Sequence, residues 1–402
     1  MKVFRFRTLM TAAMLLILGG AGQTSAKKHW VATWATAEQV AETHNNPPVP
    51  LADNSIRQIV QTSISGERLR VKLSNEFGKE PIEIKAAEIA IALTSGNSPL
   101  IDEQTNTSLT FNGSTSVTIE PGALVVSDPV DLKMTIRQNM AITLHLGQCP
   151  ANIITSHPGS RTDSYIAQGN TSNFNNATAT AHWYIINAIE VEAKGNARAV
   201  VILGNSITDG RGSTTNVQNR WTDIFSRRLL ANKATENVAV LNMGLGGNCI
   251  LQGGLGPTGQ SRYPRDLFQQ EGVKYIILFE GVNDLGGFGD AVAKADRIIE
   301  VYKKIIEEAH QKGIKVYGGT VMPFKGNNYY SENHEEGRCK LNDWIRTCGL
   351  FDGIVDHAAS MASPDDPARM NPAFLFENDW LHPNADGHRH MGESVDLSLF
   401  TK

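Results

Sequence analysis

Residues 199–210 read Ala-Val-Val-Ile-Leu-Gly-Asn-Ser-Ile-Thr-Asp-Gly, and this stretch decides how the second half of the chain is expected to fold. The continuous apolar run from Ala199 to Leu203 is typical of a strand buried on both faces of a parallel sheet. Gly204 then permits a tight turn, and the chain becomes polar before a helical pattern begins. The stretch therefore predicts a strand-to-helix turn with Ser206 close to the carboxyl end of the strand.

The remainder of the C-terminal half repeats this alternation of strand and helix. A strand-helix alternation is the signature of an α/β doubly wound domain built on a parallel sheet. Such folds bind ligands at the carboxyl ends of their strands, so the segments that follow the strands are candidate site segments. Further strands are expected at 239–241, 275–279 and 315–318, and helices at 221–230, 291–311 and 333–347.

The pattern between residue 27 and about residue 196 is that of short β-strands, with no clear helix. Apolar and polar residues alternate over 56–64 and 69–73, and Ser65-Gly66 between them forms a turn. Strands at this spacing predict a β-sandwich or jelly-roll-like domain. We favour a structural or carbohydrate-facing module over a second activity. The other expected strands are 108–111, 117–119, 130–136 and 141–146.

The N-terminus has the composition of a leader. Lys2, Arg5 and Arg7 precede an apolar run from 9 to 20, and the small residues 24–26 suit cleavage. The run is too short to cross a bilayer, so it predicts a secretory signal peptide and export to the periplasm or the extracellular space. No Cys lies near the cleavage point, which argues against a lipid anchor.

The length and charge of the chain bound its organisation and its partners. The 402 residues are enough for two cores, and we expect a signal peptide at 1–26, a β-sandwich-like accessory domain at 27–196 and an α/β domain at 197–402. Removing the leader takes away three positive charges and moves the net charge from −4 to −7. A mildly acidic chain argues against nucleic acid or an anionic membrane as the main partner, and no stable membrane insertion is expected.

The four cysteines suggest neither a metal site nor an obvious disulfide. Cys339 and Cys348 are the closest pair in sequence, but a helix over 333–347 would hold their Cα atoms about 13 Å apart. A disulfide needs Cα atoms within about 7 Å. Cys149 and Cys249 stand alone, and the sequence contains no C-x-x-C or H-E-x-x-H spacing, so no metal site is expected.

Three segments at predicted strand ends carry residues whose groups are suited to catalysis. Ser206 offers an alcohol, although Ser and Asn are also ordinary turn and capping residues. The glycine-rich segment 242–248 lets a backbone N–H approach a ligand, although a flexible loop is the better explanation when the segment is taken alone. Asn283, within 281–284, donates a hydrogen bond without titrating and suits an oxyanion better than an Asx-turn alone.

The fourth segment is Asp379-Trp380-Leu381-His382, close to the C-terminus. An acid three residues before a His is weak evidence by itself, because His is often a surface or capping residue. Together with Ser206, however, these two residues supply the alcohol, imidazole and carboxylate of a nucleophilic hydrolase.

Ser206, Gly247, Asn283 and His382 occur in the order and contexts of the four blocks of the SGNH (GDSL-type) hydrolases, an esterase and lipase family that the sequence resembles. The blocks extend over residues 200–392. The upstream segment from His-Trp-Val-Ala-Thr-Trp at 29–34 to Leu-Ser-Asn-Glu-Phe-Gly at 73–78 is similar to the N-terminal module of some secreted bacterial members.

The resemblance implies a role for each matching residue. Ser206 would be the nucleophile, and its backbone N–H, that of Gly247 and the side-chain amide of Asn283 would form the oxyanion hole. His382 would act as general base and then acid, oriented by Asp379. Asn205 departs from the family pattern, which usually has Asp there. Asn is nearly isosteric and keeps an acceptor, so the turn should survive with altered electrostatics.

Other conspicuous residues have weaker functional interpretations. Trp380 and Met322-Pro323-Phe324 could line the pocket, and Arg262 and Tyr263 could form its rim, although packing is favoured for all of them. His388 and His390 are two apart on a predicted helix and would not face one ligand. His357 is expected at the surface. Asp209 is expected to be a turn or helix-start acid.

These patterns predict a secreted serine esterase that removes short acyl groups, such as acetyl, from a polysaccharide or a small ester, with no metal or organic cofactor. One alternative is a lipase or arylesterase. Another, from a different class, is a glycan-binding protein whose hydrolase domain is inactive.

Overall fold

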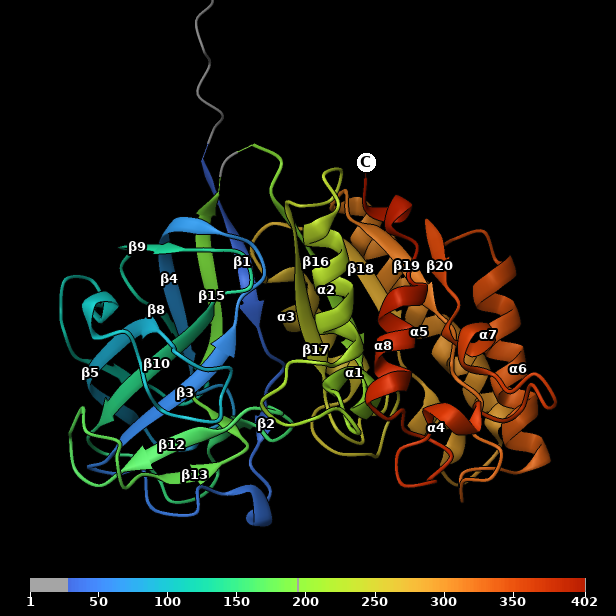
Figure 1. Ribbon diagram of the computed structural model, residues 1–402. Coiled ribbons are helices and arrows are strands. Elements are labelled where there is room, and N and C mark those ends of the chain that lie inside the picture. The colour runs from blue at the N-terminus through green and yellow to red at the C-terminus, as the bar shows by residue number, and fades with distance from the viewer. Residues whose placement is uncertain (1–27, 194, 402) are drawn as a thin grey trace, which may run out of the picture.

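The computed structural model describes residues 28–193 and 195–401 (Figure 1). The predicted signal peptide lies outside the described residues. In the described part the chain forms a strand-rich N-terminal region and a C-terminal region of alternating strands and helices, which lie side by side in Figure 1.

The C-terminal region is built on a five-stranded sheet in the order β17-β16-β18-β19-β20, and all four pairings are parallel. The predicted parallel sheet is therefore confirmed. Its strands are β16 (Arg198–Gly204), β17 (Val238–Gly244), β18 (Val273–Phe279), β19 (Lys315–Gly319) and β20 (Gly353–Val355). In β16 every residue from Ala199 to Leu203 has no exposed surface, as the apolar run predicted.

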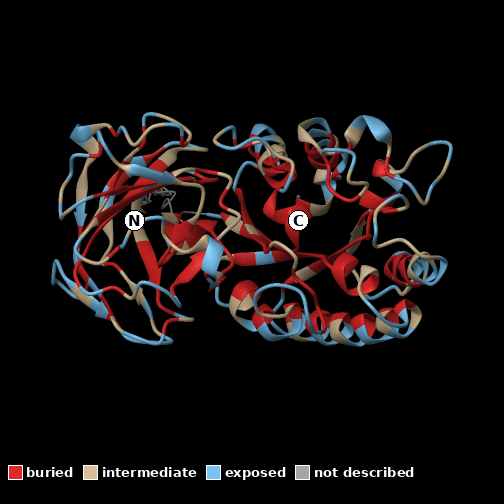
Figure 2. Ribbon diagram, turned by 90° about the horizontal axis from the view of Figure 1, so that it is seen from below, coloured by how far each residue is buried: buried red, intermediate tan, exposed pale blue. Residues whose placement is uncertain are grey.

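Helices cover both faces of this sheet, as Figure 2 shows. Helices α2, α7 and α8 pack together on one face, and α3, α5 and α6 pack on the other. The predicted helices α2, α5 and α6 are confirmed, and the bounds of α5 match those expected. The helices are α1 (Ser206–Asp209), α2 (Trp221–Ala231), α3 (Gly259–Phe268), α4 (Val282–Gly286), α5 (Ala291–Gln311), α6 (Glu332–Thr347), α7 (His357–Met361) and α8 (Ala385–Ser394).

The N-terminal region contains two larger antiparallel sheets. In the first, β1 (His29–Ala35), β15 (Ile186–Ala193), β4 (Gly66–Ser74) and β8 (Leu124–Val126) lie in that order, and β9 (Val130–Met134) also pairs with β4. The second has the order β13-β12-β3-β10-β5-β6, with β7 on β5. Its strands are β13 (Thr178–Thr180), β12 (Ser164–Ala167), β3 (Ser55–Gln61), β10 (Asn139–Leu146), β5 (Ile82–Ile91), β6 (Thr107–Leu109) and β7 (Val117–Ile119).

A small third sheet, with β14 (Trp183–Tyr184), β11 (Thr155–His157) and β2 (Gln39–Val40), completes this region. Within residues 28–193 the only helical turns are two short 3-10 turns at 43–45 and 103–105. The expectation of a strand-rich region without a substantial helix is thus confirmed, and the jelly-roll-like arrangement stays a prediction.

The N-terminal region covers the free edge of the parallel sheet at β17. Thr36 forms an isolated bridge with Asn242 of that strand. The Ser63 hydroxyl accepts a hydrogen bond from the backbone N–H of Val240 at 3.1 Å and donates one to its carbonyl at 3.2 Å. An uncovered edge strand would expose a row of unpaired backbone groups. The two regions are therefore joined through main-chain hydrogen bonding.

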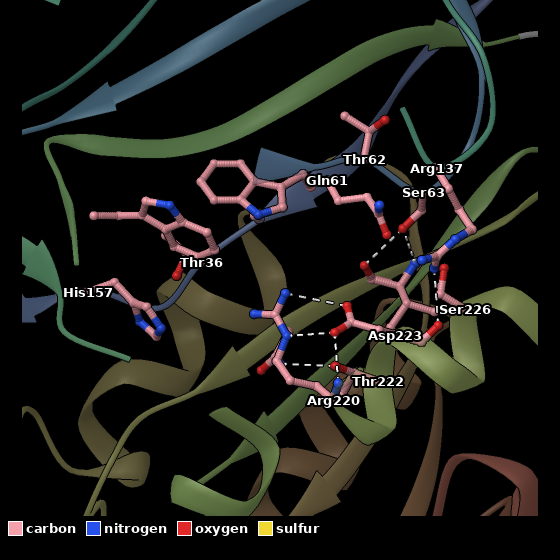
Figure 3. Close-up of a pocket in the computed structure, with 15 residues that line it drawn as sticks. Thr36, Gln61, Thr62, Ser63, Arg137, His157, Arg220, Thr222, Asp223 and Ser226 are labelled. Atoms are coloured by element: carbon pink, nitrogen blue, oxygen red, sulfur yellow. Dashed lines mark hydrogen bonds and ion pairs between the residues drawn. The ribbon is translucent and has the colours of Figure 1, made fainter. Parts of the chain in front are cut away.

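A small polar cavity lies at this junction (Figure 3). Ser63, Arg137, His157 and Asp223 are among its lining residues. The guanidinium of Arg137 reaches across to the backbone carbonyl of Asp223 at 3.1 Å. The cavity volume of about 30 Å³ is that of one or two water molecules, so it cannot hold a sugar or an ester.

Candidate active site

Ser206 occupies the first position of α1, directly after the turn that ends β16. The Asn205 side-chain oxygen caps this helix by accepting the backbone N–H of Ile207 at 3.0 Å. The turn packs closely on β17, because a Cβ on Gly244 would lie 2.2 Å from the backbone nitrogen of Asp209. Only glycine allows that approach. The helix begins earlier than expected, and its first N–H groups have no acceptor within the helix.

A chain of two hydrogen bonds joins Asp379, His382 and Ser206. The Ser206 Oγ lies 2.8 Å from His382 Nε2, and His382 Nδ1 lies 2.6 Å from Asp379 Oδ2. A carboxylate accepts only, so His382 donates through Nδ1, and its neutral Nε2 then presents a lone pair to the serine hydroxyl. The structure thus brings together Ser206 and His382, which are 176 positions apart in the sequence.

The Asp379 carboxylate is held by more than the imidazole. Its Oδ1 accepts the backbone N–H groups of Leu381 at 2.9 Å and of His382 at 2.8 Å. Burial by itself would raise the pKa of Asp379. The hydrogen bonds from the His382 ring and from the two backbone groups outweigh that effect and lower the pKa below its usual value. Asp379 therefore stays ionised.

The loop that carries Asp379 is strained and tied down. Glu377, Asn378 and Trp380 have φ angles of 50°, 56° and 57°, a conformation that non-glycine residues rarely adopt. The loop is anchored by Asn327, whose amide donates to the Asp379 carbonyl at 2.6 Å. Surrounding contacts therefore impose the backbone shape that aims the carboxylate at His382.

The predicted oxyanion-hole residues follow β17 and β18. Gly247 lies in the loop after β17 at φ 64°, and its N–H makes no hydrogen bond to another described residue. Asn283 is the second residue of α4. Its amide donates to the Asn248 carbonyl at 2.7 Å, and its oxygen accepts from the Tyr329 hydroxyl at 3.0 Å. These contacts orient the amide and leave it one further N–H to offer a ligand.

A cavity of about 270 Å³ lies beside Asn283. Gly253, Gly254, Lys294 and Phe288 are among its lining residues. Phe288 follows two glycines and has the full exposure of a free side chain, at 104%. An entire aromatic face is therefore available to a ligand at the rim of this cavity.

Arg262 and Tyr263 do not form a rim, and both are packing residues, the role that the sequence analysis favoured. Arg262 has no exposed side-chain surface. Tyr263 is 3% exposed and its hydroxyl donates to Glu308 of α5 at 3.0 Å. Both belong to α3, a helix that the sequence analysis did not recognise because Pro264 interrupts its pattern. The helix turns both side chains inward.

The other suggested pocket residues divide between core and surface. Met322 and Phe324 are buried in the main hydrophobic core, at 2% and 0% exposure. Trp380 is partly buried beside Gly326, and the Arg369 guanidinium lies 5.2 Å from its ring. Packing therefore accounts for Met322, whereas Trp380 keeps some exposed surface between the two residues of the Asp-x-x-His segment.

The expectation that His357 lies at the surface is wrong. Its ring is fully buried between Trp221 and Phe279, and neither ring nitrogen has a hydrogen-bond partner in the described part of the chain. Burial lowers the pKa of His357 to about 3. His388 and His390 contact different partners, since His388 bonds to the carbonyl of Arg211 and His390 to that of Ser360, each at 3.0 Å.

Asp209 has partners that the sequence did not reveal. Its buried carboxylate lies 3.0 Å from His157 Nε2 and 2.8 Å from the Arg161 guanidinium, and both partners belong to the N-terminal region. Burial alone would raise the pKa of Asp209, but these two groups outweigh it and lower the pKa. Residues more than 40 positions apart meet here, and no local pattern signals such a contact.

Among the described residues there is no group of three His, Cys, Asp or Glu side chains that could hold a metal ion. All four cysteines are free in the structure, and Cys339 lies within α6, as expected. No helix in the described ranges is long and apolar enough to cross a membrane.

Comparison with known proteins finds one family that is similar to the region carrying this site. Residues 202–390 match the GDSL-like lipase/acylhydrolase family. No curated protein matches the chain.

Several solved structures are similar to parts of the chain. An acetyl xylan esterase is 19% identical, with a TM-score of 0.36, and the alignment covers 49% of this chain and 96% of the esterase. A family two carbohydrate esterase from Clostridium thermocellum, in complex with cellohexaose, is 17% identical, with a TM-score of 0.37 and coverage of 84% and 91%. A GDSL-like lipase from Bacteroides thetaiotaomicron is 18% identical, with a TM-score of 0.36 and coverage of 50% and 87%.

The match over residues 202–390 begins within β16, ends within α8 and includes Ser206, Asn283 and His382. Residues 202–390 of this chain are thus similar to the GDSL-like lipase/acylhydrolase family.

Proposed function

We propose that this protein is an exported serine esterase that removes short acyl groups from a carbohydrate through an acyl-serine intermediate. The observation that carries the esterase proposal is the hydrogen-bonded chain Asp379–His382–Ser206, with distances of 2.6 and 2.8 Å. A serine alcohol is a poor nucleophile unless a base lies within hydrogen-bond reach, and His382 is that base.

The proposed reaction begins when Ser206 Oγ attacks the ester carbonyl carbon while His382 Nε2 takes the hydroxyl proton. The carbonyl π electrons move to oxygen, and the N–H groups of Ser206 and Gly247 and the Asn283 amide stabilise that charge. Collapse of the tetrahedral intermediate breaks the bond to the alcohol, which receives the proton from His382. Water, deprotonated by the same imidazole, then releases the acid from Ser206.

The preference for a short acyl group and a carbohydrate is supported by the surroundings of Asn283. The adjoining cavity of about 270 Å³ is below the usual size of drug-binding pockets, which suits a small group. The freely exposed Phe288 ring at its rim offers an apolar face of the kind that packs on the C–H surface of a sugar. The predicted leader supports export to the compartment where polysaccharides occur.

Acetate release from acetylated polysaccharides tests the proposal. The purified chain should release acetate from at least one of acetylated xylan and acetylated pectin, which carry acetyl esters, and Ser206→Ala should abolish the release. Chromogenic esters of increasing acyl length form the second arm, in which rates should fall steeply beyond short chains. Faster turnover of long chains would identify a lipase. Glycan binding without turnover of any ester would identify a binding protein.

A further inference from the structure

A buried carboxylate lies directly behind the turn that presents Ser206. Glu280, which follows β18, has no exposed surface. Its Oε2 accepts a hydrogen bond from the Asn205 amide and another from the backbone N–H of Gly281, each at 3.1 Å. The Tyr302 hydroxyl accepts a hydrogen bond from the backbone N–H of Glu280 at 3.2 Å and donates one to the Glu280 carbonyl at 3.0 Å. Glu280 is thus firmly placed two residues before α4.

Arg262 connects this carboxylate to the rest of the site. One guanidinium nitrogen lies 3.6 Å from Glu280 Oε1 and donates to the Gly204 carbonyl at 2.9 Å. Other guanidinium nitrogens donate to the Met243 carbonyl at 2.8 Å and to the Asn248 side chain at 2.9 Å. The side chain that the sequence suggested for the rim therefore lies beneath the site and joins the ends of β16, β17 and β18.

Both the oxygen and the nitrogen of the Asn205 side-chain amide form hydrogen bonds. Its oxygen accepts the Ile207 N–H and caps α1, and its nitrogen donates to Glu280. Aspartate could keep the cap but could not donate to Glu280. It would also place two buried carboxylates about 3 Å apart, and like charges at that distance force one of them to take up a proton.

We propose that Asn205 and Glu280 form a matched amide–carboxylate pair of positioning residues, which fixes the Ser206 turn relative to the oxyanion-hole segment at Asn283. The effect on turnover rests on the proposed esterase function. The pairing itself does not, because it is a physical contact that unfolding measurements detect.

The groups that face Glu280 come from several elements. Arg262 of α3 is the cation, Asp284 of α4 is a further acid, and Tyr302 of α5 contributes its hydroxyl. Asp266 neutralises Arg262 from the same helix at 2.8 Å. Burial, the largest influence, raises the pKa of Glu280 to about 8, and Arg262 opposes the rise. An added carboxylate at position 205 would therefore be disfavoured most strongly at high pH.

The test compares Asn205→Asp, Glu280→Gln and the double variant on a short-chain chromogenic ester. At pH 9, above the pKa of Glu280, Asn205→Asp should lower kcat at least about tenfold, with KM changed by less than about threefold, because positioning is lost while the binding surface is kept. The loss should shrink at pH 6, where one of the two carboxyls can be protonated. Glu280→Gln should have a small effect, since its amide oxygen can still accept from Asn205.

The double variant reverses the polarity of the hydrogen bond, because Gln at position 280 can donate to Asp at position 205. It should regain kcat to within about threefold of the parent at both pH values, so the two effects should be strongly non-additive. Activity of Asn205→Asp equal to the parent at both pH values would overturn the proposal, as would additive losses in the double variant.

Unfolding by urea provides the independent readout. The same four proteins should show a coupling between positions 205 and 280, measured in the free energy of unfolding, even if no ester is hydrolysed. If Asn205→Asp alone fails to fold, recovery of a folded double variant supports the pairing, and a double variant that is equally unfolded overturns it. An inactive parent with intact coupling would count against the esterase assignment and leave the pairing standing.

Discussion

Asp209 lies 3.0 Å from His157, although the first belongs to the helix that begins with Ser206 and the second to the strand-rich N-terminal region. Arg161 contacts the other oxygen of the same carboxylate at 2.8 Å. The N-terminal region thus supports the short helix that presents the serine. The N-terminal region therefore contacts the element that carries Ser206, which a module that is merely appended would not do.

Replacing Arg161 with Met should therefore lower kcat for a short ester by about tenfold, because the buried Asp209 loses its guanidinium partner and α1 becomes less firmly placed. The matched control is Arg68→Met, which removes a half-exposed arginine of the same region. Steady-state kinetics on both variants is the measurement. An Arg161→Met enzyme as active as the Arg68→Met enzyme would show that the contact does not support turnover.

The roles of His382 and Asp379 should be separable. His382→Ala removes the base and should reduce kcat by about 10⁶, whereas Asp379→Ala should cost about 10⁴, because it removes the group that orients the base and leaves the base in place. His390→Ala serves as the control, since His390 lies on α8 and bonds to Ser360. Burst and steady-state kinetics with a chromogenic ester measure the losses. Equal activity of all three variants would assign these residues to a surface loop.

Ser63→Ala should destabilise the whole protein. The serine hydroxyl serves both backbone groups of Val240 on the edge strand β17, and its removal leaves a buried N–H and C=O without that partner. Leaving such groups unpaired costs about 1–3 kcal/mol in the free energy of unfolding. Urea unfolding measures this, with the exposed Ser172→Ala as the control. A change no larger than that of the control would mean that the edge is held by other contacts.

Stability should fall at acid pH, with His357 as a contributor. An unfolded His takes up a proton as the pH falls through about 6.5, whereas burial holds the pKa of the native His357 at about 3. Its contribution is therefore present above pH 6.5 and is lost progressively as the pH falls toward 3. His357→Phe should reduce the drop in Tm between pH 7 and pH 4. Part of the drop should remain, because burial also lowers the pKa of His388, to about 4.

The control for that experiment is His44→Phe, which replaces an exposed histidine of the N-terminal region. It should leave the pH dependence of Tm unchanged. A His357→Phe protein whose Tm falls with pH as steeply as that of the parent would show that other groups govern acid stability.

Phe288→Ala should separate polymeric from small substrates. If the ring packs on a sugar, kcat/KM for an acetylated polysaccharide should fall by about threefold to tenfold, the range of a single aromatic contact, while a small chromogenic ester should be unaffected. Leu93→Ala is the control, because Leu93 is 61% exposed in the N-terminal region. Equal losses on both substrates would place Phe288 in the general structure of the site.

Local patterns predicted much of the C-terminal fold because they depend on residues close in sequence. The apolar run before Ser206 reports a strand buried on both faces, and the periodic apolar residues of α5 report a helix with one buried face. Short or interrupted elements were not predicted from such patterns. The three-residue β20 has too few residues for a pattern, and Pro264 conceals α3.

Part of the candidate site could be predicted from the sequence for the same reason. The sequence by itself determined which residues carry the reactive groups, since an alcohol, an imidazole, a carboxylate and an amide are identifiable by type and by their place after predicted strands. Only the tertiary structure decided their geometry and their supports, among them the 2.8 Å contact of Ser206 with His382, the burial of Arg262 and the reach of His157 to Asp209. Those contacts join residues far apart in the chain, and packing brings them together without leaving a local sequence pattern.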